Sequence, residues 1–305
     1  MKIIFMGTPD FAAVCLKRIA AEHEISAVFS QPDKPVGRKR ILTPPAVKKT
    51  AEELGIAVLQ PEKLRDESII EQIKYMAPEA VVVVAYGRIL PPDILNIPKY
   101  GCINVHASLL PKYRGAAPIQ WAVINGEEET GVTTMFMNEG LDTGDMLLKE
   151  KVKIGETETS GELFGRLSEI GAELLAKTLK QLETGGLKPQ KQDDGSATYA
   201  PMLDKTLCPV DFSSDAKAVC SKINGLSPWP AATTLFNGET LKIYRAQTVD
   251  MSGREGTLLD DKKLIVACKK NAVRLLEVQL VGSKQMNDED FLRGHKIQIG
   301  STIGI

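Results

Sequence analysis

The chain has 305 residues, 43% of them hydrophobic and 25% charged, which suits a soluble globular protein of two domains or one large one. Its net charge of −1 excludes a uniformly basic nucleic-acid-binding surface, so any anionic partner must meet a local patch. Five scattered cysteines without a C-x-x-C pair argue against a disulfide framework and a zinc cluster, and they indicate a reducing cytoplasm. We expect no signal peptide and no membrane span, because no apolar run approaches ~20 residues.

The first hundred residues predict an α/β unit. Residues 2–6 and 25–29 are typical of strands, and the apolar residues between them have helical spacing. Residues 80–85 are continuously apolar, as in a central strand covered on both faces. Ile89 and Leu90 follow that strand, where they either line an apolar ligand slot or belong to the core. Gly7 lacks the partner glycines of a dinucleotide-binding fingerprint, which argues against NAD or FAD binding.

Residues 30–49 are predicted to be a loop without regular structure, because five prolines and glycines interrupt them. Arg38, Lys39 and Arg40 stand at its centre, and Asp33 is the single acidic residue in this range. A charge run of this kind is more often a solvated surface. The alternative is a mobile basic arm that binds the phosphates of a nucleic acid.

Asn104 and His106 end an apolar run, and Asp142 lies in a glycine-bracketed turn after a second predicted strand at residues 130–137. On a strand, the two-residue spacing puts Asn104 and His106 on the same face. These side chains suit transfer of an acyl group between nitrogens. The amide can donate to the oxyanion, the imidazole can donate or move a proton, and the carboxylate can hold the imidazole. Such a transfer requires no covalent nucleophile.

Each of the three residues also has a structural interpretation. A histidine near a strand end is more often structural, Asn104 can cap a turn, and Asp142 can form an Asx-turn. The triplet Asp142-Thr143-Gly144 also matches the aspartic-protease motif. That chemistry needs two facing carboxylates, and the sequence contains one copy.

The remainder predicts a long helix followed by a second domain. Residues 146–152 are expected to pair with the strand at 130–137, and a helix capped by Thr159 or Ser160 extends to about Glu183. From Cys208 onward, a helix at 215–224 precedes short strands at 233–236, 240–244, 256–259, 264–267 and 272–281, which suggest a small β-barrel. The predicted domains are residues 1–187 and 208–305, with a linker at 188–207.

Three runs surround the candidate residues: Asn104-Val105-His106-Ala107-Ser108-Leu109-Leu110-Pro111, Arg114-Gly115-Ala116-Ala117-Pro118 and Gly140-Leu141-Asp142-Thr143-Gly144-Asp145. Others lie near the two ends: Met6-Gly7-Thr8-Pro9, Gln31-Pro32-Asp33 and Asp290-Phe291-Leu292-Arg293-Gly294. Together they resemble the signature of the 10-formyltetrahydrofolate-dependent formyltransferases, and the resemblance covers essentially the whole chain.

The resemblance implies a Rossmann-like formyltransferase domain followed by an OB-like β-barrel domain. It implies catalytic roles for Asn104, His106 and Asp142. It also implies folate binding by a loop and by two residues beside the pterin. These residues are Ser108, Leu109, Leu110 and Pro111 in the loop, with Ile89 and Leu90 beside the pterin.

Within this family, the basic loop and the C-terminal domain indicate methionyl initiator tRNA as the acceptor. The formylated tRNA would then be used in translation initiation. Arg38 matches the arginine that reaches the acceptor end of the tRNA, and Lys39 and Arg40 are further tRNA-binding candidates. We expect a cytoplasmic monomer that uses 10-formyltetrahydrofolate and no metal ion. A folate enzyme acting on a sugar-nucleotide or glycinamide ribonucleotide amine would need no basic loop. A non-catalytic RNA-binding protein would leave the three candidate residues unexplained.

Overall fold

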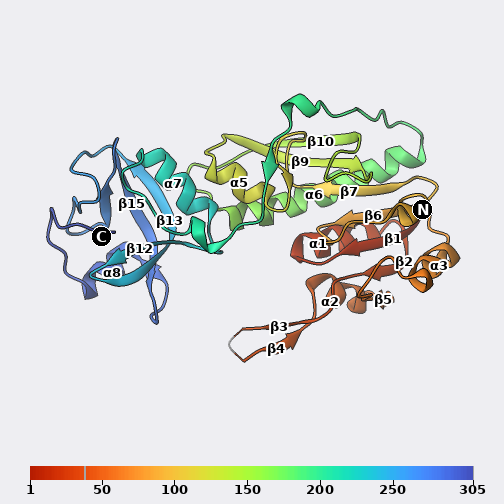
Figure 1. The fold of residues 1–305 in the computed structure, drawn as a ribbon, viewed down its shortest axis with the longest axis horizontal. Coiled ribbons are helices and arrows are strands. Elements are labelled where there is room, and N and C mark those ends of the chain that lie inside the picture. Colours follow the sequence, from red (N-terminus) through yellow and green to blue (C-terminus); the bar gives the residue numbers. More distant parts are fainter. Residues whose placement is uncertain (38, 305) are drawn as a thin grey trace. The chain divides into compact units, whose positions relative to one another are not determined.

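The computed structural model describes residues 1–37 and 39–304 (Figure 1). Over this range the chain divides into two compact units. Unit 1 contains residues 1–115, 131–151 and 164–199, and unit 2 contains residues 116–130, 152–163 and 200–305. Two short segments from the middle of the chain therefore group with the C-terminal residues. Among the helices of the described residues, none has the length and apolar character needed to cross a membrane.

Unit 1 is built around a mostly parallel sheet with the strand order β10-β9-β7-β6-β1-β2-β5. Its strands are β1 (Lys2–Gly7), β2 (Glu24–Phe29), β5 (Val58–Leu59), β6 (Ala80–Val84), β7 (Cys102–His106), β9 (Glu129–Phe136) and β10 (Met146–Lys153). β1 pairs in parallel with β2 and β6, β6 pairs in parallel with β7, and β9 is antiparallel to β7. The strand order reverses between β1 and β6, and open α/β sheets bind ligands beyond the carboxyl ends of the strands at such a point.

Helices cover both faces of this sheet. They are α1 (Asp10–Ala20), α2 (Ala46–Glu53), α3 (Glu67–Met76), α4 (Pro92–Leu95) and α6 (Ser160–Glu183). Gly171 of α6 has so little space beside Phe11 of α1 and Val105 of β7 that an added Cβ would lie 2.9 Å from the Phe11 ring. α1 and α6 therefore pack on the same face of the sheet, the face to which Val105 points.

The other face of β7 carries the candidate site. Cys102 points to that face, because its Sγ lies 3.9 Å from the carbonyl oxygen of Ile94 in α4. Side chains alternate along a strand, so Asn104 and His106 share the face of Cys102. The predicted α/β, Rossmann-like fold is confirmed, with helices on both faces of a parallel-dominated sheet.

Gly7, at the end of β1, is required by packing. A Cβ at this position would lie 2.6 Å from Ala12 Cβ in α1 and 3.0 Å from the carbonyl oxygen of Val84 in β6. Real Cβ atoms do not approach other atoms so closely. The close packing of α1 against β1 and β6 therefore explains why position 7 is a glycine, although the further glycines of a dinucleotide-binding loop are missing.

Residues 30–49 contain regular structure, so the prediction of an irregular loop was wrong. β3 (Lys34–Val36) pairs antiparallel with β4 (Ile41–Thr43) to form a hairpin, and α2 begins at Ala46. Pro35 lies opposite Leu42 in this hairpin. An isolated two-stranded ribbon tolerates proline because each strand has a free edge.

Unit 2 is built on an antiparallel sheet with the strand order β12-β13-β15-β14, to which β16 is added beside β15. The strands are β12 (Ala232–Phe236), β13 (Glu239–Val249), β14 (Ile265–Ala267), β15 (Ala272–Leu280) and β16 (Met286–Asn287), and the helices are α5 (Pro118–Ile124), α7 (Ala216–Gly225) and α8 (Asp288–Gly294). β13 extends beyond the predicted 240–244. The strand predicted at 256–259 is present only as isolated bridges at Thr257 and Leu258.

Residues 188–207 also contain regular structure. They include two short 3-10 helices, Asp194–Ser196 and Lys205–Leu207, and strand β11 (Tyr199–Ala200). β11 pairs with β8 (Arg114–Gly115), and the Arg114 amide donates to the carbonyl oxygen of Thr198. This pairing brings residues 190–198 close to the segment that follows Pro111.

Candidate active site

The structure brings Asn104, His106 and Asp142 together. Asn104 and His106 lie on β7, and Asp142 lies in the loop between β9 and β10. Asn104 Nδ2 donates to Asp142 Oδ1 over 3.4 Å, and His106 Nδ1 lies 3.6 Å from Asp142 Oδ2. The carboxylate thus faces both side chains, as their spacing on a strand predicted.

The orientation of the His106 ring is fixed on its other side. His106 Nε2 lies 2.9 Å from the carbonyl oxygen of Tyr113. A carbonyl oxygen only accepts hydrogen bonds, so Nε2 must carry the hydrogen. Nδ1 is therefore the ring nitrogen that faces Asp142. The imidazole is only 5% exposed, so this arrangement is shielded from bulk water.

Asp142 is held by its backbone as well as by its neighbours. Its φ of 53° lies in the left-handed region, which aspartate adopts more readily than most residues. The Gly115 amide donates to Asp142 Oδ2 over 2.8 Å, a shorter contact than those of the carboxylate with Asn104 and His106. The carboxylate is thereby held at a defined position.

The two glycines that bracket Asp142 are needed for close approaches. A Cβ at Gly144 would lie 1.7 Å from the carbonyl oxygen of Phe136, at the end of β9. A Cβ at Gly140 would lie 2.1 Å from Thr143 Oγ1. The Gly-Leu-Asp-Thr-Gly pattern is therefore what allows the loop to fold back and present Asp142 to β7.

The predicted folate-binding residues Ser108, Leu109, Leu110 and Pro111 directly follow β7. Thr133 of β9 joins two of them, because its hydroxyl donates to the Ser108 carbonyl oxygen and accepts from the Leu110 amide. Lys149 of β10 donates to the Leu110 carbonyl oxygen over 2.5 Å, and partial burial lowers the pKa of this lysine. The loop is thus tied to the sheet at three backbone positions.

Ile89 and Leu90 differ in their surroundings. Ile89 is 77% exposed just beyond the carboxyl end of β6, whereas Leu90 is 2% exposed and packs in the hydrophobic cluster that includes Ile94 and Cys102. Ile89 therefore offers an apolar surface at the edge where the strand order reverses. Leu90 lies in the core of the unit.

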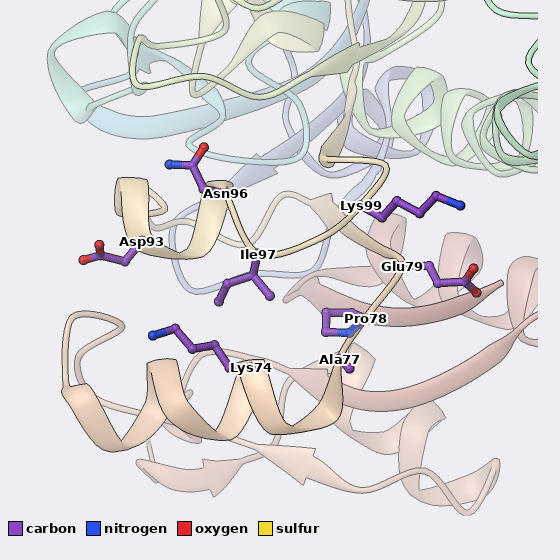
Figure 2. Close-up of a pocket in the computed structure, with 8 residues that line it drawn as sticks. All are labelled: Lys74, Ala77, Pro78, Glu79, Asp93, Asn96, Ile97 and Lys99. Carbon is purple, nitrogen blue, oxygen red and sulfur yellow. The ribbon is translucent and has the colours of Figure 1, made fainter.

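A pocket of about 610 Å³ lies at the opposite edge of the sheet (Figure 2). Its lining includes Lys74, Glu79 and Lys99, and Glu79 and Lys99 precede β6 and β7 respectively. Asn104 and His106 lie toward the carboxyl end of β7. The pocket therefore lies away from the three candidate residues.

The hairpin β3–β4 projects from the sheet of unit 1 (Figure 1). Lys39 and Arg40 are exposed in its turn, and Arg38 lies outside the described residues. Ile41 and Leu42, which follow on β4, are 62% and 63% exposed. The structure thus presents Lys39 and Arg40 on a projecting hairpin, distinct from the face of β7 that carries Asn104 and His106.

No local sequence pattern indicates the two residues that support the Asp142 loop. Gln192 donates to the carbonyl oxygens of Asp142 and Gly144, and the buried Arg114 donates to Gln192. Gln192 lies in a polar stretch that reads as a linker, 50 residues after Asp142. A side chain that acts at such a separation leaves no periodic pattern.

Two family models match the chain. One described as Formyl transferase matches residues 1–179, and one described as Formyl transferase, C-terminal domain, matches residues 202–296. The chain therefore belongs to the formyl transferase family, as its sequence runs predicted.

Relatives within the family are more specific. A protein of Citrifermentans bemidjiense named methionyl-tRNA formyltransferase is 49% identical over 307 residues, covering 100% of this chain and 96% of the relative. The methionyl-tRNA formyltransferase of Caldanaerobacter subterraneus subsp. tengcongensis is 49% identical over 308 residues, covering 99% and 100%. The N-formyltransferase of Helicobacter canadensis, solved with folinic acid and dTDP-3-aminofucose, shares the fold with a TM-score of 0.69 and 18% identity, covering 90% of this chain and 98% of that one.

Proposed function

We propose that this chain transfers the formyl group of 10-formyltetrahydrofolate to the α-amino group of methionyl initiator tRNA. The observation that carries the proposal is the convergence of Asn104, His106 and Asp142 on one face of β7. The three residues converge in a chain that is 49% identical, over its whole length, to a protein named methionyl-tRNA formyltransferase. The product, formylmethionyl-tRNA, serves translation initiation.

Asn104 suits the stabilisation of the carbonyl oxygen. Bound 10-formyltetrahydrofolate supplies the activated formyl group, and attack by an amine places negative charge on its oxygen. An amide nitrogen has two hydrogens, so Asn104 Nδ2 donates one to Asp142 and has the other for that oxygen. Loss of such a donor costs about 3 kcal/mol of transition-state stabilisation in other enzymes.

His106 and Asp142 suit proton transfer. Tyr113 holds the hydrogen on His106 Nε2, which leaves Nδ1 to accept a proton from the attacking amine. Asp142 Oδ2, 3.6 Å from Nδ1, stabilises the imidazolium that results. The imidazolium then returns this proton to the departing N10 nitrogen as the bond between N10 and the formyl carbon breaks, which releases tetrahydrofolate. The α-amino group has a pKa near ~8, so roughly a tenth of it is already neutral at pH 7 and modest base assistance is enough.

The folate site is proposed at Ser108–Pro111 and Ile89. The exposed Ile89 side chain at the carboxyl edge of β6 provides apolar surface for a flat ring system. The loop of Ser108, Leu109, Leu110 and Pro111 is tied to β9 through Thr133, which suits a rigid binding wall. Leu90, also expected beside the pterin, is buried in the cluster that includes Ile94 and Cys102.

The tRNA-binding residues are proposed on the hairpin β3–β4. Lys39 and Arg40 are exposed cations on a projecting ribbon, and Arg38 stands beside them in the sequence. Such an arm is able to contact several phosphates at once. An acceptor as small as a sugar-nucleotide amine would leave the arm without a partner. We further propose that the enzyme acts in the cytoplasm and that it is a monomer. Light scattering of the purified protein tests the oligomeric state.

The acceptor is tested by measuring formyl transfer from 10-formyltetrahydrofolate to three substrates in parallel. These are methionyl initiator tRNA, methionyl elongator tRNA and an amino-sugar nucleotide. We expect rapid transfer to the initiator tRNA and slow or undetectable transfer to the other two. Transfer to the amino sugar alone would overturn the proposed acceptor while retaining formyl chemistry.

A further inference from the structure

We infer that Gln192 is a positioning residue that fixes the Asp142 loop for catalysis, and that Arg114 orients its amide. The inference rests on the proposed function, because it concerns the carboxylate assigned to that reaction. Gln192 Nε2 donates to the carbonyl oxygen of Asp142 over 2.7 Å and to that of Gly144 over 2.8 Å. One amide group thus uses both of its hydrogens on one loop.

The direction of the Gln192 amide is determined by its neighbours. Gln192 Oε1 accepts from Arg114 Nε over 3.0 Å and from Arg114 Nη2 over 2.8 Å. A guanidinium only donates and the two loop carbonyls only accept, so the amide has one orientation that satisfies all four bonds. Arg114 is 2% exposed, and its Nη2 also donates to Asp194 Oδ1 over 2.8 Å.

Part of the loop is exposed, so its position depends on hydrogen bonds, among them those that Asn138 Oδ1 accepts from the Gly140 amide and the Thr143 hydroxyl. Glu139, Gly140 and Leu141 are exposed, and Leu141 is 56% exposed although it is apolar. Asp142 itself has a φ of 53°, a conformation that costs a non-glycine residue free energy unless its surroundings hold it. The two bonds from Gln192 hold the carbonyl oxygens of Asp142 and Gly144, so they fix the backbone directly after the Cα from which the carboxylate projects.

Glutamine is the residue type that fits this position. Glutamate has the same shape and keeps an acceptor for Arg114, but it places an oxygen against the two loop carbonyls and removes both donors. Gln192→Glu should therefore release the loop while preserving the volume and the Arg114 contact. Gln190→Glu is the matched control, because Gln190 is an exposed glutamine on the same segment whose backbone pairs with Met146.

The first test is a kinetic double-mutant cycle with methionyl initiator tRNA. We expect Gln192→Glu to lower kcat by about tenfold or more with little change in KM for either substrate, since a shift of about 1 Å in a catalytic group is sufficient. In an Asp142→Asn background, Gln192→Glu should change kcat by less than about twofold, because the group that Gln192 positions is already altered. Gln190→Glu should leave kcat unchanged in both backgrounds.

The second test does not depend on activity. The Gly115 amide donates to Asp142 Oδ2 over 2.8 Å, so its hydrogen exchange reports whether the carboxylate is in place. Exchange at Gly115 should accelerate about tenfold or more in Gln192→Glu and not in Gln190→Glu.

The two tests separate this inference from the proposed function. If the wild-type enzyme formylates the initiator tRNA while Gln192→Glu retains its kcat and its Gly115 protection, the positioning role is wrong. Equal losses of kcat in the wild-type and Asp142→Asn backgrounds also overturn it, because Gln192 would then act independently of Asp142. If the wild-type enzyme shows no transfer to tRNA, the proposed function fails and Gly115 exchange alone decides the role of Gln192.

Discussion

At the scale of single residues, the candidate site is held by backbone conformations that non-glycine residues seldom adopt. Tyr113 and Asp142 have φ values of 60° and 53°, and such conformations cost of order 1–3 kcal/mol each. The Tyr113 amide donates to Thr198 Oγ1 over 2.8 Å, and Gln192 holds the Asp142 carbonyl oxygen. These bonds offset the cost. The Tyr113 conformation directs its carbonyl oxygen at His106 Nε2, and the Asp142 conformation directs its carboxylate at Nδ1.

Gly144 lets the Asp142 loop approach the end of β9 closely. Gly144→Ala places a Cβ 1.7 Å from the Phe136 carbonyl oxygen, so the loop must move away from β9 and carry Asp142 with it. We expect kcat to fall about tenfold or more, together with a loss of about 1–3 kcal/mol of stability, measured by steady-state kinetics and urea unfolding.

Gly165→Ala is the control, because nothing lies within 4 Å of a Cβ at Gly165 in helix α6. It should raise stability by about 0.5–1 kcal/mol through helix propensity and leave kcat unchanged. Wild-type kcat in Gly144→Ala would show that the loop does not depend on this close approach.

At the scale of elements, the hairpin β3–β4, which forms the basic arm, is anchored at its base by a polar cluster. Lys48 Nζ lies 2.9 Å from Asp33 Oδ2, and Gln60 Nε2 donates to Asp33 Oδ1 over 2.8 Å. Gln60 also donates to the carbonyl oxygen of Gln31, which precedes the hairpin. Asp33, the single acid in residues 30–49, therefore joins the start of the hairpin to Lys48 of helix α2 and to Gln60, which follows β5.

This cluster predicts that the anchoring of the hairpin β3–β4 depends on pH. The hydrogen bond from Gln60 and the charge of Lys48 lower the pKa of Asp33, so the ionised carboxylate is the bound form. Its contribution to folding is present above the unfolded value of about 3.9 and is lost as pH falls through the lower folded pKa. Hairpin resonances in NMR spectra should accordingly stay constant from pH 8 to about 5 and shift below about 4.

Asp33→Asn should loosen the arm already at neutral pH, because it removes the charge that Lys48 pairs with. Limited trypsin digestion should cut the hairpin faster in this variant than in the wild type. Asp66→Asn is the control, because Asp66 precedes helix α3 without a side-chain capping bond. Equal cleavage rates in all three proteins would show that the arm does not depend on Asp33.

The elements that the sequence predicted are those with strong local signals. Helix α6 could be predicted because Thr159 and Glu162 form a reciprocal capping pair at its start, with Thr159 N donating to Glu162 Oε2 over 3.0 Å. β7 could be predicted from its apolar run, and its side-chain alternation placed Asn104 beside His106. β8 and β11 could not be predicted, because each has two residues and its partner lies 85 positions away. The β3–β4 hairpin could not be predicted, because the prolines in and around its two short strands indicate an irregular loop.

At the scale of the whole molecule, net charge is uninformative about the partner, since −1 is nearly neutral. The proposed attraction for tRNA therefore rests on local cations, and Lys39 and Arg40 are the ones we propose. Affinity for methionyl initiator tRNA should therefore fall steeply with salt, and each phosphate contact contributes roughly 0.7–0.9 to the slope of log affinity against log salt.

Lys39→Ala and Arg40→Ala should each reduce that slope by about one contact, measured by filter binding at several salt concentrations. Lys99→Ala provides the control, because Lys99 lies in the pocket at the opposite edge of the sheet. A slope equal to that of the wild type in both hairpin variants would remove the arm from the tRNA interface.

The central claim is that Asn104, His106 and Asp142 perform formyl transfer to methionyl initiator tRNA. Single-turnover transfer from 10-formyltetrahydrofolate, compared between the wild type, Asn104→Ala and His106→Ala, tests it most directly. We expect each variant to remain folded and to transfer about 100-fold more slowly or worse, because each loses a group that acts on the reacting atoms. Near-wild-type transfer by either folded variant would contradict the assignment.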